Sequence, residues 1–315
     1  MPRMFHALLA LAAIALGIPG GANATQVALS FDDLPGLTLH DQDTVDRFNH
    51  DLLAGLERHH IPATGFVNEG KIDELDRQRQ IAILGQWLRA GMDLGNHTYS
   101  HESLDTLDAG QFVADISRGE GVIRGLMAQH GKRLHWFRYP NLETGKDAAT
   151  KAWVANWLVA HRYRSAPVTI DADDWEFAEP YEDALLGHDT ARAARIRAEY
   201  LAHTAKTIDW SRRAARTLFG RDIAYVMLLH DSRLNADCID GLAALFGLRH
   251  MHFVSLDHAM RDPAYRTPDP YVGPDGIEWL ERWSQALGRT LPWDDFSEVP
   301  VDIREAYDRL DTDRN

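Results

Sequence analysis

Cysteine is nearly absent from this sequence. The 315 residues include a single cysteine, Cys238, so an intrachain disulfide is excluded and no cluster of thiolates can hold a metal. We interpret Cys238 as a buried residue, because a free cysteine behaves as a small hydrophobic side chain. An excess of basic charge is also lacking: 47 acidic and 33 basic residues give a formal net charge of -14. Such a surface repels phosphate backbones, which argues against nucleic acid as a partner.

Long hydrophobic runs are lacking as well, and the one apolar stretch near the N-terminus is short. Residues 7–18 form a small apolar segment behind Arg3, and residues 22–24 have the small-x-small pattern of a cleavage site. The apolar segment is too short for a stable membrane span. The sequence predicts a secretory signal peptide over residues 1–24, and hence an exported protein, secreted or periplasmic, without a membrane span.

Glycine-serine linkers, low-complexity tracts and internal repeats are also missing, so we expect one domain over residues 25–262. Short apolar segments alternate there with segments of helical periodicity. Strands joined by helix-length connections are expected to be parallel, with right-handed crossovers. We therefore predict an α/β fold, a distorted or incomplete (β/α) barrel of about seven parallel strands. The predicted strands are 26–31, 63–67, 92–94, 134–137, 167–170, 223–229 and 252–256.

Two longer segments have a composition of their own. The alanine-rich segment 180–219 is expected to be helical throughout. Residues 263–315 begin with several prolines and then carry tryptophans, among them Trp279 and Trp283 at helical spacing. We predict that this region is a C-terminal extension packed on the barrel, with both indoles buried, and not a second domain.

Polar residues follow the predicted strands at the point where each strand ends. In α/β barrels the carboxyl ends of the strands converge on one face, where active sites are built. We therefore expect these residues to share one mouth of the barrel. They are Asp32, Asp33, His97, His101, Arg138, Asp171, Asp174 and His230.

The histidine pair suggests a metal site. His97 and His101 are four residues apart, a spacing that lets two imidazoles converge on one point. Two imidazoles and one carboxylate leave coordination positions open for water and substrate, which is the arrangement of a catalytic zinc. Asp32 or Asp33 could supply the carboxylate. A His/His/carboxylate set prefers zinc, cobalt or nickel over calcium.

Five motifs in a fixed order carry a resemblance to a known family. They are S-F-D-D at residues 30–33, H-T-x-x-H at 97–101, R-Y-P at 138–140, D-x-x-D-W at 171–175 and L-L-H at 228–230. Together they resemble the polysaccharide deacetylase family, the carbohydrate esterases built on the NodB homology domain. The resemblance extends from about residue 26 to residue 256 and implies a distorted barrel fold and a hydrolase that removes acetyl groups from sugars.

The resemblance also implies roles for individual residues. It makes Asp33, His97 and His101 the metal ligands, with Thr98 bracing their loop. Asp32 would be the general base, held by Arg138, and His230 the general acid, held by Asp174. The backbone N–H of Tyr139 would stabilise the oxyanion, and Trp175 and Leu228 would wall the acetyl pocket. From their charges we expect Arg138 to lower the pKa of Asp32 and Asp174 to raise the pKa of His230.

The sequence leaves the substrate and some alternatives open. Asn141 follows the R-Y-P motif where the family often has an aromatic residue, so the loop beside the groove is uncertain. Each polar cluster taken alone also has a purely structural interpretation, such as a turn at Asp32 and Asp33 or a strand-end His230. We therefore keep three hypotheses: a deacetylase of N-acetyl or O-acetyl sugars, a non-catalytic carbohydrate-binding protein on the same scaffold, and a metal-dependent hydrolase of a small amide.

Overall fold

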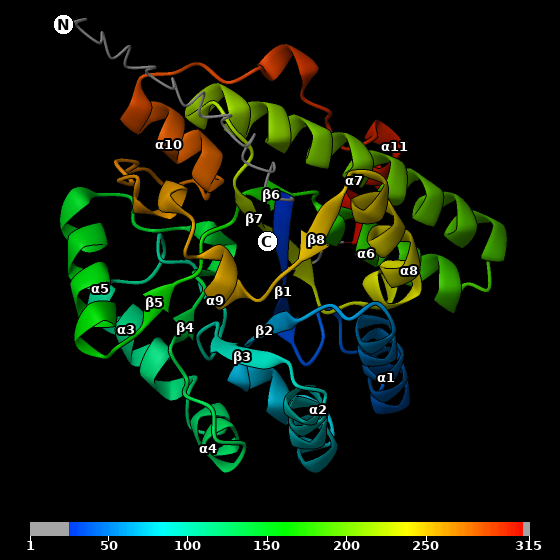
Figure 1. The fold of residues 1–315 in the computed structure, drawn as a ribbon. Coiled ribbons are helices and arrows are strands. Elements are labelled where there is room, and N and C mark those ends of the chain that lie inside the picture. Colours follow the sequence, from blue (N-terminus) through cyan, green and yellow to red (C-terminus); the bar gives the residue numbers. More distant parts are fainter. Residues whose placement is uncertain (1–24, 311–315) are drawn as a thin grey trace, which may run out of the picture.

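The computed structural model describes residues 25–310 (Figure 1). The predicted signal peptide, residues 1–24, lies outside the described residues. The strands are β1 Thr25–Leu34, β2 Ala63–Val67, β3 Asp93–Asn96, β4 Trp136–Phe137, β5 Arg164–Ser165, β6 Ile170–Asp171, β7 Ala224–His230 and β8 Met251–Phe253. The α-helices are α1 Gln42–Arg58, α2 Arg77–Arg89, α3 Ala109–Arg118, α4 Ile123–Gln129, α5 Ala148–Ala160, α6 Asp174–Leu186, α7 Thr190–Phe219, α8 Arg233–Leu248, α9 Leu256–Ala259, α10 Trp279–Leu287 and α11 Val301–Leu310. The 3-10 helices are η1 Glu69–Asp73, η2 Pro140–Leu142, η3 Pro263–Arg266 and η4 Trp293–Asp295.

All strands belong to one parallel sheet, as predicted. The order is β5-β4-β3-β2-β1-β7-β6, and β8 pairs with the beginning of β1. Helices surround the strands on the outside (Figure 1). Within the described residues β5 and β6, the two ends of this path, do not pair with each other, so the barrel is open between them. The sheet has eight strands, since the sequence did not predict the short strand β5.

Side-chain alternation along β1 and β7 decides what faces the inside of the barrel. Ala28 and Val226 are register partners and lie in a small apolar cluster to which four strands contribute, which places them inside. Because side chains alternate along a strand, the next inward positions are Ser30 and Leu228, followed by Asp32 and His230. The inner face thus changes from apolar to ionisable toward the carboxyl ends of the strands.

The helices differ from the sequence expectation in one region. The segment 180–219 is not one helix: α6 ends at Leu186, and α7 starts at Thr190 after a short break. His188 in this break has φ 57°, a left-handed conformation that interrupts a helix. In the part of the chain that the structure describes, no helix is long and apolar enough to cross a membrane.

The C-terminal extension packs on the barrel through aromatic and charged side chains. Trp279 and Trp283 are both buried, as predicted, and Trp283 contacts Phe219 at the end of α7 edge-on, with ring centroids 5.6 Å apart. The backbone N–H of Trp279 donates to Val168 O at 2.9 Å, beside the gap between β5 and β6. The extension therefore covers the open side of the barrel.

One buried arginine of α10 holds the loop that follows β4. The Arg282 side chain is fully buried and donates to Leu142 O and Thr144 Oγ1, both at 2.7 Å, and to Asp269 Oδ2 at 3.0 Å. Leu142 has φ 57°, a left-handed conformation that persists only where neighbours fix it. Arg282 therefore links the extension to a strained loop of the barrel.

We predict that Arg282→Met lowers the free energy of unfolding by about 3 kcal/mol, because it leaves buried acceptors without a donor. The control is Arg213→Met, which removes a solvent-exposed ion pair between α7 and Asp295 of the same extension. Exposed pairs contribute about 0 to 1 kcal/mol, so this variant should stay close to the wild type. Urea unfolding of both variants measures the difference, and equal losses would contradict the prediction.

Candidate active site

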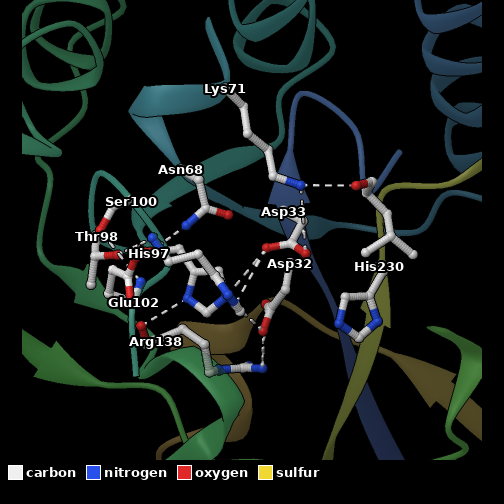
Figure 2. A network of polar contacts seen from close by, with 12 residues as sticks. Asp32, Asp33, Asn68, Lys71, His97, Thr98, Ser100, Glu102, Arg138 and His230 are labelled. Atoms are coloured by element: carbon white, nitrogen blue, oxygen red, sulfur yellow. Dashed lines mark hydrogen bonds and ion pairs between the residues drawn. The ribbon is translucent and has the colours of Figure 1, made fainter. Parts of the chain in front are cut away.

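The predicted polar residues meet at the carboxyl ends of the strands. Asp32 and Asp33 lie near the end of β1, His97 follows β3, Arg138 follows β4, and His230 ends β7. Figure 2 shows these side chains turned toward one another. Asp174 begins α6, directly behind His230. The structure therefore brings together the clusters that the sequence placed at separate strand ends.

Asp33, His97 and His101 form a compact set of donor atoms. The Oδ1 atom of Asp33 lies 3.7 Å from Nε2 of His97 and 3.6 Å from Nε2 of His101. These distances are too long for hydrogen bonds. They are near the separation of about 3.3 Å that two ligands of one tetrahedral zinc would have. Asp33 Oδ1 is also buried without a hydrogen-bond partner, so the three residues fit a divalent cation.

The imidazoles are neutral, as metal ligands must be. Burial lowers the pKa of His97 and of His101 to about 4 in each case. His97 Nδ1 lies 2.9 Å from the carbonyl oxygen of Arg138, which fixes the tautomer and leaves the lone pair of Nε2 facing Asp33. Burial by itself would raise the pKa of Asp33, but Lys71 and the two imidazoles hold it well below its usual range.

The histidine pair does not lie on a helix. His97 to His101 form a turn after β3, in which Thr98 and His101 have φ 69° and 60°. The backbone N–H of His101 donates to Thr98 Oγ1 at 3.0 Å, so the threonine does brace this loop. The imidazoles converge because of this left-handed turn, and the helical spacing assumed from the sequence is not the cause.

Asp32 Oδ2 lies 3.6 Å from Nε2 of His97, the same nitrogen that Asp33 approaches, and Asp32 is held by Arg138. The guanidinium donates to Asp32 Oδ2 at 3.1 Å and to Ser30 Oγ at 2.9 Å. Arg138 lowers the pKa of Asp32, as expected from the sequence, but it does not set the net direction of the shift. Burial of the carboxyl outweighs the attraction of Arg138 and raises the pKa of Asp32 to about 6. Arg138 still lowers it relative to an unpaired buried acid.

His230 is held by Asp174 through two contacts. Its ring Nδ1 lies 2.8 Å from Asp174 Oδ1, and its backbone N–H donates to Oδ2 at 2.7 Å. Burial by itself would lower the pKa of His230, but the carboxylate of Asp174 raises it to about 9. This agrees with the direction expected from the sequence. The protonated ring therefore faces the site with Nε2 free of Asp174.

The three residues predicted to contact the substrate, Tyr139, Leu228 and Trp175, have different surroundings. The phenol of Tyr139 packs against Phe112 and Phe137, so only its backbone can act at the site. Leu228 is buried on the inner face of β7, one inward position before His230. The ring of Trp175 meets Tyr307 of the C-terminal extension edge-on, with centroids 4.8 Å apart.

Several residues at the site were missed by sequence reasoning. Ser30 bonds Arg138, and its position two residues before Asp32 on the same strand face could have identified it. Asn235 of α8 donates to Asp174 Oδ2 and to His230 O, and Tyr200 donates to Asn235. Lys71 approaches Asp33, and no motif marks it. Apart from Ser30, these side chains support the predicted ones from elements outside the five motifs.

Comparison with known proteins agrees with this geometry. The polysaccharide deacetylase family model matches residues 20–156. This part of the chain, less than half of its length, is therefore similar to the polysaccharide deacetylase family. The matched stretch contains the metal-site residues, Asp32 and Arg138, whereas Asp174 and His230 lie beyond it. A curated relative, the peptidoglycan-N-acetylglucosamine deacetylase of Bacillus cereus, is 24% identical over 176 residues. That alignment covers 55% of this chain and 56% of the relative, little more than half of each.

Solved structures of this family share the fold. A polysaccharide deacetylase from Bacillus cereus matches with a TM-score of 0.52 and 18% identity over 73% of this chain and 91% of its own. A family 4 carbohydrate esterase from Streptomyces lividans in complex with acetate matches with a TM-score of 0.51 and 20% identity. This match covers 76% of this chain and 96% of the esterase. A mutant with restored activity of a family 4 pseudoenzyme from Bacillus anthracis matches with a TM-score of 0.52 and 16% identity. This match covers 76% of this chain and 68% of the mutant. At these identities the likeness shows the fold, which a pseudoenzyme also has, so activity must be argued from residues.

We predict that His97→Ala and His101→Ala each lower the amount of zinc bound below one equivalent, because each removes one of three donors. The matched control is His130→Ala, which changes an exposed histidine next to the end of α4. Elemental analysis after dialysis against zinc gives the stoichiometry. Full zinc content in both site variants would exclude these ligands.

Proposed function

We propose that this protein is a metal-dependent hydrolase that removes acetyl groups from N-acetylated sugars of a polysaccharide or oligosaccharide. One observation carries the proposal: the Asp33, His97 and His101 cluster lies next to a buried carboxylate whose register partner on the adjacent strand is an imidazolium. Asp32 is the carboxylate and His230 the imidazolium, and each has its own partner of opposite charge. A non-catalytic carbohydrate-binding protein would have no need of this acid and base.

The donor set favours zinc, with cobalt or nickel as alternatives. Two neutral imidazoles and one carboxylate suit these metals better than calcium or magnesium, which prefer oxygen ligands. When bound, the cation supplies Lewis acidity toward a carbonyl oxygen and a water molecule. Asp33, His97 and His101 would hold it, leaving the side of the cluster toward Asp32 and His230 for water and substrate.

The chain's own residues provide the proton transfers. Asp32 takes a proton from the attacking water as the new carbon–oxygen bond forms. The backbone N–H of Tyr139 stabilises the negative charge on the former carbonyl oxygen. His230 then donates its proton to the sugar nitrogen as the carbon–nitrogen bond breaks, which yields acetate and an amine. Asp32 and His230 are register partners on β1 and β7, so the base and the acid lie close enough to act on the same substrate.

The substrate class follows from the relatives and from the predicted export. The curated relative is named for N-acetylglucosamine of peptidoglycan, and one solved neighbour is an esterase, so amide and ester substrates both occur on this fold. An exported, secreted or periplasmic enzyme would meet acetylated cell-wall or environmental glycans. N-linked acetyl groups are our first choice because His230 is held as an acid, and an amine leaving group requires protonation.

We predict that Asp32→Asn lowers acetate release from N-acetylated chitooligosaccharides by about 10²- to 10⁴-fold, because it removes the general base. Bound zinc should remain near one equivalent, since Asp32 is not one of the three donors. Acetate is measured with and without a chelator, and with zinc added back, on chitin, peptidoglycan and xylan fragments. Loss of zinc in this variant would reverse the roles of Asp32 and Asp33.

We predict that Asp174→Asn shifts the alkaline limb of the kcat/KM profile to lower pH by about one to three units, because a charge partner within about 4 Å raises an imidazole pKa by such an amount. His230 works as an acid only while protonated, so with its pKa at about 9 the wild type should lose activity as the pH rises through 9. The control is Asp173→Asn, which changes a neighbouring carboxylate 3.7 Å from His203. An unmoved limb in Asp174→Asn would contradict His230 as the acid.

A further inference from the structure

Lys71 reaches the metal cluster from an element outside the five motifs. It belongs to η1, and its Nζ lies 3.8 Å from Asp33 Oδ2 (Figure 2). The same ammonium donates to the carbonyl oxygens of Gly36 and Leu37, at 3.1 and 2.9 Å. Three oxygens therefore surround the ammonium, and all of them come from Asp33 or from the turn just after it.

The two oxygens of the Asp33 carboxylate have different surroundings. Oδ1 faces the imidazoles of His97 and His101 and has no hydrogen-bond partner, whereas Oδ2 faces Lys71. Attraction between Oδ2 and the ammonium turns the carboxylate so that its other oxygen points at the histidines. Asp33 would thus offer the cation a single oxygen in a fixed direction.

The backbone at Asp33 also needs support. Asp33 has φ 65°, and β1 shifts register with β2 between Phe31 and Leu34, so the chain bends at the ligand. A left-handed conformation at a non-glycine residue is kept only where the surroundings over-determine it. By binding the Gly36 and Leu37 carbonyls, Lys71 fastens the turn that follows this bend.

The segment that carries Lys71 also contacts the histidine loop. The Asn68 side-chain amide donates to His97 O, and the Gly70 N–H donates to Tyr99 O at 2.9 Å. A Cβ on Gly70 would lie 2.5 Å from Tyr99 O, so only glycine fits there. Residues 68–71 therefore touch both strand ends that supply the ligands.

We propose that Lys71 is a positioning residue of the metal site, which orients the Asp33 carboxylate and the turn behind it for cation binding. This inference rests on the proposed metal site. An ammonium near a cation also repels it, but here three oxygens compensate the charge, so the loss of orientation outweighs the relief of repulsion when Lys71 is removed.

The test measures zinc affinity of the full chain by competition with a chromophoric chelator. Lys71→Met keeps the length of the side chain and removes its charge and donors, and it should weaken zinc binding by at least about tenfold, as outer partners of metal ligands typically do. Lys71→Arg keeps the charge and the donors, and it should restore affinity to within about threefold of the wild type.

Lys132 provides a matched control. Its Nζ donates to the consecutive carbonyls of Gly91 and Met92 and lies 3.9 Å from Asp93, a nearly identical clamp at the other end of β3. Lys132→Met should cost similar stability and leave zinc affinity unchanged. Unchanged or tighter zinc binding in Lys71→Met, or equal weakening in Lys132→Met, would overturn the role of Lys71. Failure of the wild type to bind zinc would instead overturn the proposed function.

Discussion

The site depends on one buried carboxylate oxygen that faces two neutral imidazoles. Asp33 Oδ1 has no hydrogen-bond donor, and burial keeps His97 and His101 unprotonated, so the charge of this carboxylate is offset mainly by Lys71, which lies 3.8 Å from its other oxygen. A buried charge without compensation is costly. The donor atoms of Asp33, His97 and His101 are therefore arranged to fit a cation. The contacts around them offset the free energy that this arrangement costs. The left-handed backbone at Asp33 and His101 is part of the same cost, which the packed loops over-determine.

Strand geometry places Asp32 and His230, the proposed proton-transfer groups, beside each other at this site. β1 and β7 are parallel neighbours, and alternation along each puts Asp32 and His230 on the inner face at the same level. Their partners come from elsewhere: Arg138 follows β4, and Asp174 begins α6. Burial raises the pKa of Asp32 to about 6, whereas Asp174 raises that of His230 to about 9. Between these values Asp32 is ionised and His230 is protonated, which is the state that the proposed hydrolysis requires.

Much of this could be predicted from sequence, because strand ends followed by polar residues are local signals. The parallel barrel, the burial of Trp279 and Trp283, and the meeting of the polar clusters followed from such patterns. Three features did not. The break at His188 depends on one left-handed residue, β5 is only two residues long, and the net pKa shift of Asp32 depends on burial depth. The roles of Lys71 and Asn235 were also not predicted, because a single supporting side chain forms no sequence motif with a recognisable spacing.

The C-terminal extension is one reason why the substrate is harder to predict from the sequence than the proposed chemistry. It lies outside the matched family region, yet it covers the gap between β5 and β6. It also reaches the loop after β4, where Gly276 lies so close that a Cβ would fall 1.6 Å from Asn141 O. Asn141 replaces the aromatic residue that the family resemblance leads one to expect. The loop after β4, which departs from the family at Asn141, is thus contacted by a segment that the family match does not include. The residues of the proposed chemistry therefore lie at strand ends and at the start of α6, whereas the contact between the extension and the barrel involves other parts of the chain.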